Sequence, residues 1–158
     1  MRVEQLMAKE VATCSPDETL HQAVRLMWER DCGFVPVVES AERRVVGVVT
    51  DRDACMAAYT RGHPLAEIRV RDVMSTRVRA CKPSDDLAAA EEVMREAKVH
   101  RLPVVDETGQ LIGVISLADL AREAARGAGS KRRAVSPAEV GETLASIRQP
   151  REIAAANV

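Results

Sequence analysis

The feature that most constrains this chain is an internal repeat. A shift of 67 positions aligns the first half with the second, and the shift becomes 66 after a turn, so that GVVTDRD at 47–53 matches GVISLAD at 113–119. Aligned pairs include Met7 and Met74, Cys14 and Cys81, Leu20 and Leu87, Met27 and Met94, and Pro36 and Pro103. The 158 residues therefore divide into one unit over 1–62, a second over 63–126 and a tail over 127–158.

Hydrophobic periodicity predicts the same elements in both units. Apolar residues three and four apart in 20–27 and 87–94 indicate amphipathic helices. Continuous β-branched runs at 34–38, 45–49, 102–105 and 111–115 indicate buried strands, joined in hairpins by polar turns. Second helices begin near Asp51 and Leu117. The expected class is mixed α/β, with a short strand, a helix, a hairpin and a helix in each unit, and with Pro36 and Pro103 at an edge or irregular position.

The tail has a different composition. Its first part is small, polar and basic, and the Lys131–Arg133 run is expected to be a solvated charge run in a linker. Beyond it, Ser136 and Pro137 fit a helix start, and Val140, Leu144 and Ile147 form an apolar stripe. This helix can dock on its own units or on a neighbouring copy, and the residues do not distinguish the two.

Composition excludes several classes of function. Lys and Arg (23) nearly balance Asp and Glu (24), and there are only three aromatic residues, so nucleic acid is not an expected partner. The apolar runs are too short for a membrane span, and the first residues lack the pattern of a signal peptide, which favours the cytoplasm. The four cysteines show no metal-binding spacing and are expected to be small buried hydrophobes.

A hydroxyl and an aspartate three residues apart recur as Thr50 and Asp53, and as Ser116 and Asp119. One explanation is a capping box, in which each side chain binds the other's backbone N–H at a helix start. The other is a nucleotide site, because a helix N-terminus favours phosphate and an ionised carboxylate accepts two hydrogen bonds from a ribose diol. Both interpretations use the same geometry.

In combination, these motifs resemble a tandem pair of CBS domains, a Bateman module of the kind found as a stand-alone bacterial protein. The resemblance covers residues 3–125 and rests on the two Gly-x-x-Ser/Thr-x-x-Asp stretches, on HRLPVVD at 100–106 with GFVPVVE at 33–39, and on VRDVM at 70–74. It implies two β-α-β-β-α repeats related by a pseudo-twofold axis, clefts that receive adenosine-containing ligands, and homodimers that stack their helices into a flat disc.

The resemblance also implies two unequal sites. Thr50, Asp53 and Arg52 would be joined by His100 and Arg101 from the other repeat, which gives that site cations for phosphate. Ser116 and Asp119 would face the uncharged Gly33 and Phe34 and form a weaker or empty site. Backbone near the first strand of each repeat, at Thr13 and Ala80, would meet the base edge.

The function that follows is a regulatory module that binds AMP, ADP, ATP or a relative and signals to an unidentified effector protein, with no obligatory cofactor. One alternative is a structural dimerisation module with empty clefts. Another is a redox or metal sensor built on Cys14 and Cys81. Trp28 is either a side of the core or a dimer contact. Catalysis is not expected, because no nucleophile or activated base accompanies Asp51 and Asp53.

Overall fold

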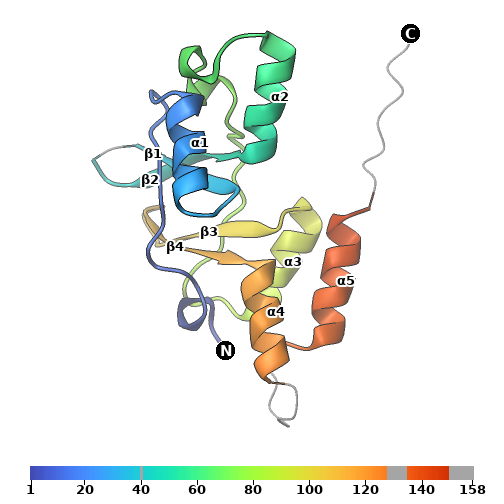
Figure 1. Ribbon diagram of the computed structural model, residues 1–158. Coiled ribbons are helices and arrows are strands. Elements are labelled where there is room, and N and C mark those ends of the chain that lie inside the picture. Colours follow the sequence, from blue (N-terminus) through green and yellow to red (C-terminus); the bar gives the residue numbers. More distant parts are fainter. Residues whose placement is uncertain (40, 128–134, 150–158) are drawn as a thin grey trace.

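The computed structural model describes residues 1–39, 41–127 and 135–149 (Figure 1). The first repeat contains α1 (Leu20–Glu29), β1 (Phe34–Glu39), β2 (Arg44–Thr50) and α2 (Asp51–Arg61). The second contains α3 (Leu87–Ala97), β3 (Arg101–Val105), β4 (Leu111–Ser116) and α4 (Leu117–Arg126), followed by the tail helix α5 (Pro137–Ile147). Short 3-10 turns lie at Val3–Gln5, Leu65–Glu67 and Val70–Asp72. The predicted α/β class and the order helix, hairpin, helix in each repeat are confirmed, while the predicted leading strand is reduced to a single bridging residue, Cys14 or Cys81.

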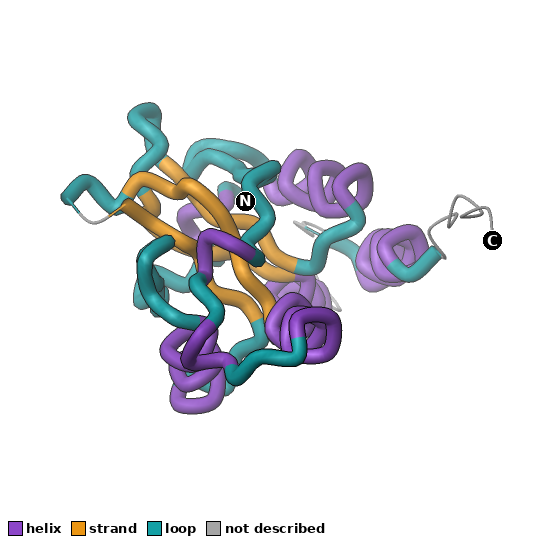
Figure 2. The backbone as a smooth tube through the Cα atoms, turned by 90° about the horizontal axis from the view of Figure 1, so that it is seen from above, coloured by secondary structure: helices purple, strands orange, loops and turns teal. Residues whose placement is uncertain are grey.

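Each repeat has an antiparallel hairpin, β1 with β2 and β3 with β4. A preceding residue extends each hairpin on its other side, because Cys14 forms a parallel bridge with Val37 and Cys81 with Val104. The strand register shifts directly after Val37 and Val104, so each predicted irregularity lies one residue beyond its proline. The two hairpins meet where Arg44 bridges Gln110, which brings the strands together in the centre of Figure 2.

The segment that precedes each repeat packs on the other repeat: residues 2–8 lie on the second repeat and residues 69–75 lie on the first. We call these the exchanged segments. Val3 N–H donates to the Asp85 carbonyl in the second repeat at 2.9 Å, and Val70 N–H donates to the Glu18 carbonyl in the first at 2.9 Å. Further along the same segments, Ala8 bridges Val114 on β4 and Ser75 bridges Val48 on β2. These reciprocal contacts follow the pseudo-twofold relation and interlock the repeats.

This exchange explains the glycine in each repeated motif. A Cβ on Gly47 would lie 2.6 Å from Met74 Sδ, and a Cβ on Gly113 would lie 2.6 Å from Met7 Sδ. A glycine suits both positions because an exchanged methionine packs directly on the strand, and at Gly113 the added Cβ would also lie only 2.9 Å from the Ala8 carbonyl oxygen.

Two hydrophobic cores follow from the predicted helix faces. In the first, Leu20, Ala23 and Met27 of α1 pack against Val35 and Val49, together with Val70 from the exchanged segment. In the second, the equivalent residues Leu87, Ala90 and Met94 pack against the second hairpin and α4, together with Val3 from the other exchanged segment. Burial of the helix stripes is therefore confirmed in both repeats.

The tail helix α5 packs on α3 and α4 of its own chain (Figure 1). Ile147 is buried and Val140 is partly buried, as the apolar stripe predicts. Leu144 does not follow the prediction, because 43% of it is exposed. Thr143 is buried instead, and its hydroxyl donates to Glu91 Oε1 of α3 at 2.7 Å. The Lys131–Arg133 run lies outside the described residues.

Helices long and apolar enough to cross a bilayer are not found anywhere in residues 1–39, 41–127 and 135–149.

Candidate functional site

The first candidate site is the N-terminus of α2, where a strand passes directly into a helix. Thr50 Oγ1 accepts a hydrogen bond from Asp53 N–H at 3.2 Å and donates to Asp53 Oδ2 at 2.8 Å. The same Oδ2 accepts from Thr50 N–H at 2.9 Å. The capping box is therefore formed, and it holds both side chains in one orientation at the helix end.

The N-terminus of α4 repeats this arrangement. Ser116 Oγ donates to Asp119 Oδ2 at 2.6 Å and accepts from Asp119 N–H at 3.2 Å, while Ser116 N–H donates to Oδ2 at 2.8 Å. Both repeats thus use one carboxylate oxygen for the cap. The remaining oxygen, Oδ1, is the one that could accept from a ligand.

The two aspartates differ at this remaining oxygen. Asp119 Oδ1 forms an ion pair with the guanidinium of Arg122, one turn further along α4. The position equivalent to Arg122 in the first repeat is Met56, and no described residue hydrogen-bonds or ion-pairs with Asp53 Oδ1. Asp53 is only partly buried and borders a hollow of about 260 Å³. Its free oxygen is therefore available to a donor, whereas that of Asp119 is already used.

Arg101 is the first residue of β3 and His100 directly precedes it; both are partly buried. The His100 carbonyl accepts from Leu117 N–H at 2.9 Å, and Arg101 pairs in register with Ser116, so these backbone contacts lie within their own repeat. Among the described residues, no hydrogen bond or ion pair joins either of them to Thr50 or Asp53. The assembly of these four residues into one site stays a prediction.

The charge of His100 depends on its surroundings. Burial lowers the pKa of this imidazole, and the nearby guanidinium groups of Arg148 and Arg101 lower it further. His100 consequently favours its neutral form near pH 7. Arg148, which caps α5, was missed in the sequence analysis. Only the docking of α5 on α3 reveals that this cation lies near His100.

The remaining predicted site residues lie at accessible positions. Arg52 is exposed in the first turn of α2, and its N–H donates to Asp51 Oδ1 at 2.7 Å. Thr13 and Ala80 are partly exposed and precede the residues that extend the hairpins. A cavity of about 560 Å³ lies between α1 and α2, and Gly33 and Asp51 are among the residues that line it.

Two of the four cysteines are buried and two are not. Cys14 and Cys81 are buried as expected, but each belongs to a different core, and both are free thiols. Burial raises the pKa of each to about 12, helped by Glu18 at Cys14 and by Asp85 at Cys81. Because the thiolate is the reactive and metal-binding form, this environment argues against the redox or metal sensor. Cys55 is exposed and Cys32 only partly buried, so the prediction that all four are buried was wrong.

Comparison with known proteins agrees with this architecture. The CBS domain family model matches residues 3–59 and 70–126. The CBS domain-containing protein YhcV of Bacillus subtilis is 35% identical over 119 residues, which cover 75% of this chain and 82% of YhcV. The chain also matches an inosine-5'-monophosphate dehydrogenase of Methanocaldococcus jannaschii but covers only 23% of its length, so that enzyme's activity does not transfer.

Solved structures show the same fold. The CBS domain protein TA0289 from Thermoplasma acidophilum superposes with a TM-score of 0.77 at 26% identity, covering 94% of this chain and 77% of that one. The CBS domain pair of protein MJ0100, solved with 5'-methylthioadenosine and S-adenosyl-L-methionine, has a TM-score of 0.70 at 17% identity, covering 77% and 94%. With two interlocked repeats, each a helix, a hairpin and a helix, and with both halves matched by the family model, the chain belongs to the CBS domain family.

Proposed function

We propose that this protein is a regulatory module of the cytoplasm that binds an adenosine-containing nucleotide at the α2 end of the first repeat. Asp53 accepts from the ribose diol, and Thr50 with the helix N-terminus receives phosphate. His100 and Arg101, from the other repeat, and Arg52 supply further phosphate contacts, while backbone at Thr13 or Ala80 meets the base edge. The ligand changes the pose of repeats that belong to a homodimer, and an effector protein responds to that change.

The observation that carries this proposal is the free Oδ1 of Asp53. The capping box orients the carboxylate but uses only Oδ2, so an acceptor is left beside a helix N-terminus whose dipole favours phosphate. A hydrogen bond to a charged acceptor of this kind contributes roughly 1.5–3 kcal/mol.

The second site, at Ser116 and Asp119, is proposed to be weaker. A diol there would have to displace Arg122 from Asp119, and Leu117 and Ala118 stand where the first repeat has the charged Asp51 and Arg52. An uncharged adenosine derivative suits this end better than a triphosphate does.

An adenosine-containing ligand is also supported by a protein that shares only the fold with this chain. The MJ0100 pair, which shares the fold, holds two adenosine derivatives. The four free cysteines are compatible with a reducing compartment.

The direct test is a thermal unfolding scan of the full chain with AMP, ADP, ATP, S-adenosylmethionine, NAD and adenosine. A ligand present at 100 times its dissociation constant should stabilise the protein by about 2.7 kcal/mol. Arg101→Ala should reduce the ATP shift more than the adenosine shift, because adenosine lacks phosphates. Equal losses with both ligands would contradict the phosphate role of Arg101.

A structural dimerisation module is the second candidate. Both capping boxes are satisfied without a ligand, so capping alone accounts for the presence of all four side chains. If no member of the panel shifts the unfolding temperature, this second function replaces the first.

A further inference from the structure

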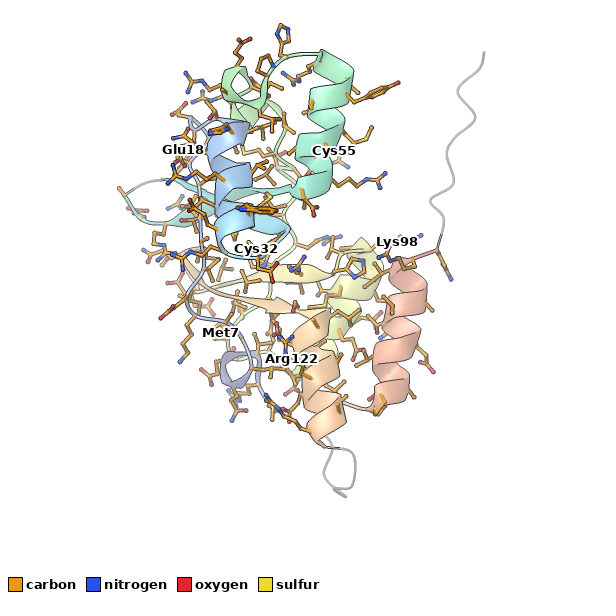
Figure 3. All side chains as sticks on the ribbon, viewed as in Figure 1. Met7, Glu18, Cys32, Cys55, Lys98 and Arg122 are labelled. Atoms are coloured by element: carbon orange, nitrogen blue, oxygen red, sulfur yellow. The ribbon has the colours of Figure 1, made fainter. Side chains whose placement is uncertain are left out.

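One end of the second repeat gathers basic side chains from two separate segments of the chain. The end of α3 and the start of β3 supply Lys98, His100 and Arg101, and Arg148 directly follows α5. Figure 3 shows Lys98 near the end of α5, which packs on α3. We call these four residues the basic cluster.

The packing of α5 on α3 produces this arrangement. Both helices run upward in Figure 1, and Thr143 Oγ1 donates to Glu91 Oε1 at 2.7 Å. Arg148 lies five residues beyond Thr143, and Lys98 lies seven residues beyond Glu91, so at 1.5 Å per residue the two cations differ by only about 3 Å along the helix axes. Burial, and then the charge of Arg148, lower the pKa of His100, which agrees with this placement.

The positive charge of the basic cluster is not neutralised within residues 1–39, 41–127 and 135–149. None of its four side chains forms an ion pair with an acid in these ranges. Three of the four are partly buried, whereas Arg148 is exposed. Because like charges held close together repel one another, a bound polyanion would remove a cost that the ligand-free protein carries.

The first repeat shows that the fold does not require these cations. The positions equivalent to 98, 100 and 101 are Asp31, Gly33 and Phe34. Asp31 and Lys98 even share the left-handed backbone conformation, with φ of 48° and 53°. A helix C-terminus favours a nearby cation, which accounts for one basic residue after α3 and one after α5. It does not account for the adjacent pair at 100 and 101.

We propose that the basic cluster binds the phosphate chain of the nucleotide, and that this contact fastens α5 to the second repeat. The identity of the ligand as a nucleotide rests on the proposed function, whereas Arg148 and the response of α5 go beyond it. The tail helix thereby becomes the element that reports the number of phosphates to an effector protein.

The helix α5 is suited to such a response. An isolated helix of eleven residues is marginal in water, so α5 depends on its contacts with α3 and α4. Its buried side chains include Thr143 and Ile147. Elements held by a small contact surface open at a lower free energy than the rest of a protein, and one additional contact at Arg148 shifts that equilibrium.

Hydrogen exchange of the full chain measures how firmly α5 is held, with ATP, adenosine or inorganic tripolyphosphate each at a saturating concentration. We expect ATP and tripolyphosphate to slow exchange of the α5 amides by about threefold or more, and adenosine to leave it unchanged. Arg148→Gln should abolish the slowing. In titration calorimetry the same variant should weaken ATP binding about five- to tenfold and leave adenosine binding unchanged.

Arg126→Gln is the matched control, because it removes an exposed cation from the end of α4 that lies farthest from its N-terminus. It should match wild type in both measurements, with circular dichroism confirming that each variant is folded.

The failures of the two proposals are distinguishable. ATP that binds wild type without slowing exchange in α5, or that binds Arg148→Gln as tightly as wild type, would overturn the role of α5 and leave the nucleotide site standing. If ATP and adenosine do not bind but tripolyphosphate still slows exchange, the proposed function fails while the basic cluster remains an anion site. No slowing with either phosphate compound would overturn the basic cluster as a binding site.

Discussion

The first and second repeats have the same backbone plan and the same capping boxes, yet they differ where a ligand or a partner would bind. In the second repeat, Arg122 uses the outward oxygen of Asp119 and α5 covers the helices. In the first repeat, Met56 replaces that arginine and the α1–α2 face is open. Residues needed for packing and capping are therefore matched between the two repeats, whereas the residue beside each aspartate and the cover of the outer helical face differ.

The largest effect is expected at the exchanged segments. Replacing Gly113 with Val would place its Cβ 2.9 Å from the Ala8 carbonyl oxygen, so backbone must move, at a cost of about 3 kcal/mol. At Gly47 the nearest backbone atom is farther, with Ser75 O at 3.2 Å, and Gly47→Val should cost less. Urea unfolding of both variants measures the difference.

Gly141→Ala is the matched control for this pair, because beyond its own helix backbone and chain neighbours no described atom lies within 4 Å of the added Cβ, and the position is helical. It should stabilise the protein by up to about 1 kcal/mol. Equal destabilisation at Gly47 and Gly113 would show that the two exchanges are tolerated alike.

The next effect concerns the pair that anchors α5. Thr143→Val leaves Glu91 buried without its donor and should cost about 1–3 kcal/mol in free energy of unfolding. Glu91 occupies the position of Val24 in the first repeat, so the double variant Thr143→Val, Glu91→Val should recover most of the loss. Chemical denaturation of the two singles and the double completes a mutant cycle, and simple additivity would contradict the pairing.

A reciprocal exchange tests the ligand sites themselves. Arg122→Met should free Asp119 Oδ1 and raise nucleotide affinity at the second site by about three- to tenfold, equivalent to roughly 0.7–1.4 kcal/mol. Met56→Arg should weaken the first site by a similar factor. The stability of both variants should change by less than about 1 kcal/mol, because the Arg122 side chain is 62% exposed. Titration calorimetry supplies affinity and stoichiometry, and unchanged binding in both variants would remove the explanation for unequal sites.

The smallest effect is a pH dependence. In the free protein, burial and the cations Arg148 and Arg101 lower the pKa of His100, and a bound phosphate would oppose both. Binding should therefore take up a proton, so affinity for ATP should rise by a few-fold between pH 8 and pH 6. The same lowered pKa means that the ligand-free protein loses stability as pH falls below the unfolded value of about 6.5.

His100→Gln is the control for this prediction, since it keeps a polar side chain without a titrating group. Its ATP affinity should follow only the protonation of ATP itself. A pH dependence identical to that of wild type would exclude His100 from the phosphate contacts.

Local patterns were enough to predict the secondary structure. Helix stripes such as Leu20, Ala23 and Met27, and β-branched strand runs, are determined by neighbours within a few residues. The exchange of 2–8 and 69–75 could not be predicted in this way, because a contact such as Val3 with Asp85 joins residues far apart in the chain and has no local periodicity. The burial of Thr143 could not be predicted for a related reason, because its hydroxyl donates to Glu91, which belongs to another helix.

The candidate site was partly visible in the sequence. The three-residue spacing of Thr50 and Asp53 correctly predicted the capping box, because that geometry is local. The spacing of Asp119 and Arg122 was also readable, but only the structure assigns their ion pair to the oxygen that the cap leaves unused. Arg148 could not have been placed near His100 before the docking of α5 was known.

Parallel titrations of ATP into wild type, Asp53→Asn and Asp119→Asn would show whether the two repeats are unequal nucleotide sites. The amide keeps an oxygen for the cap and removes the charged acceptor, so both variants should fold. We expect Asp53→Asn to weaken ATP binding about tenfold or more, and Asp119→Asn to leave ATP binding close to wild type. Equal losses of ATP affinity in the two variants, or a loss in Asp119→Asn alone, would contradict the proposal that the first repeat holds the stronger site.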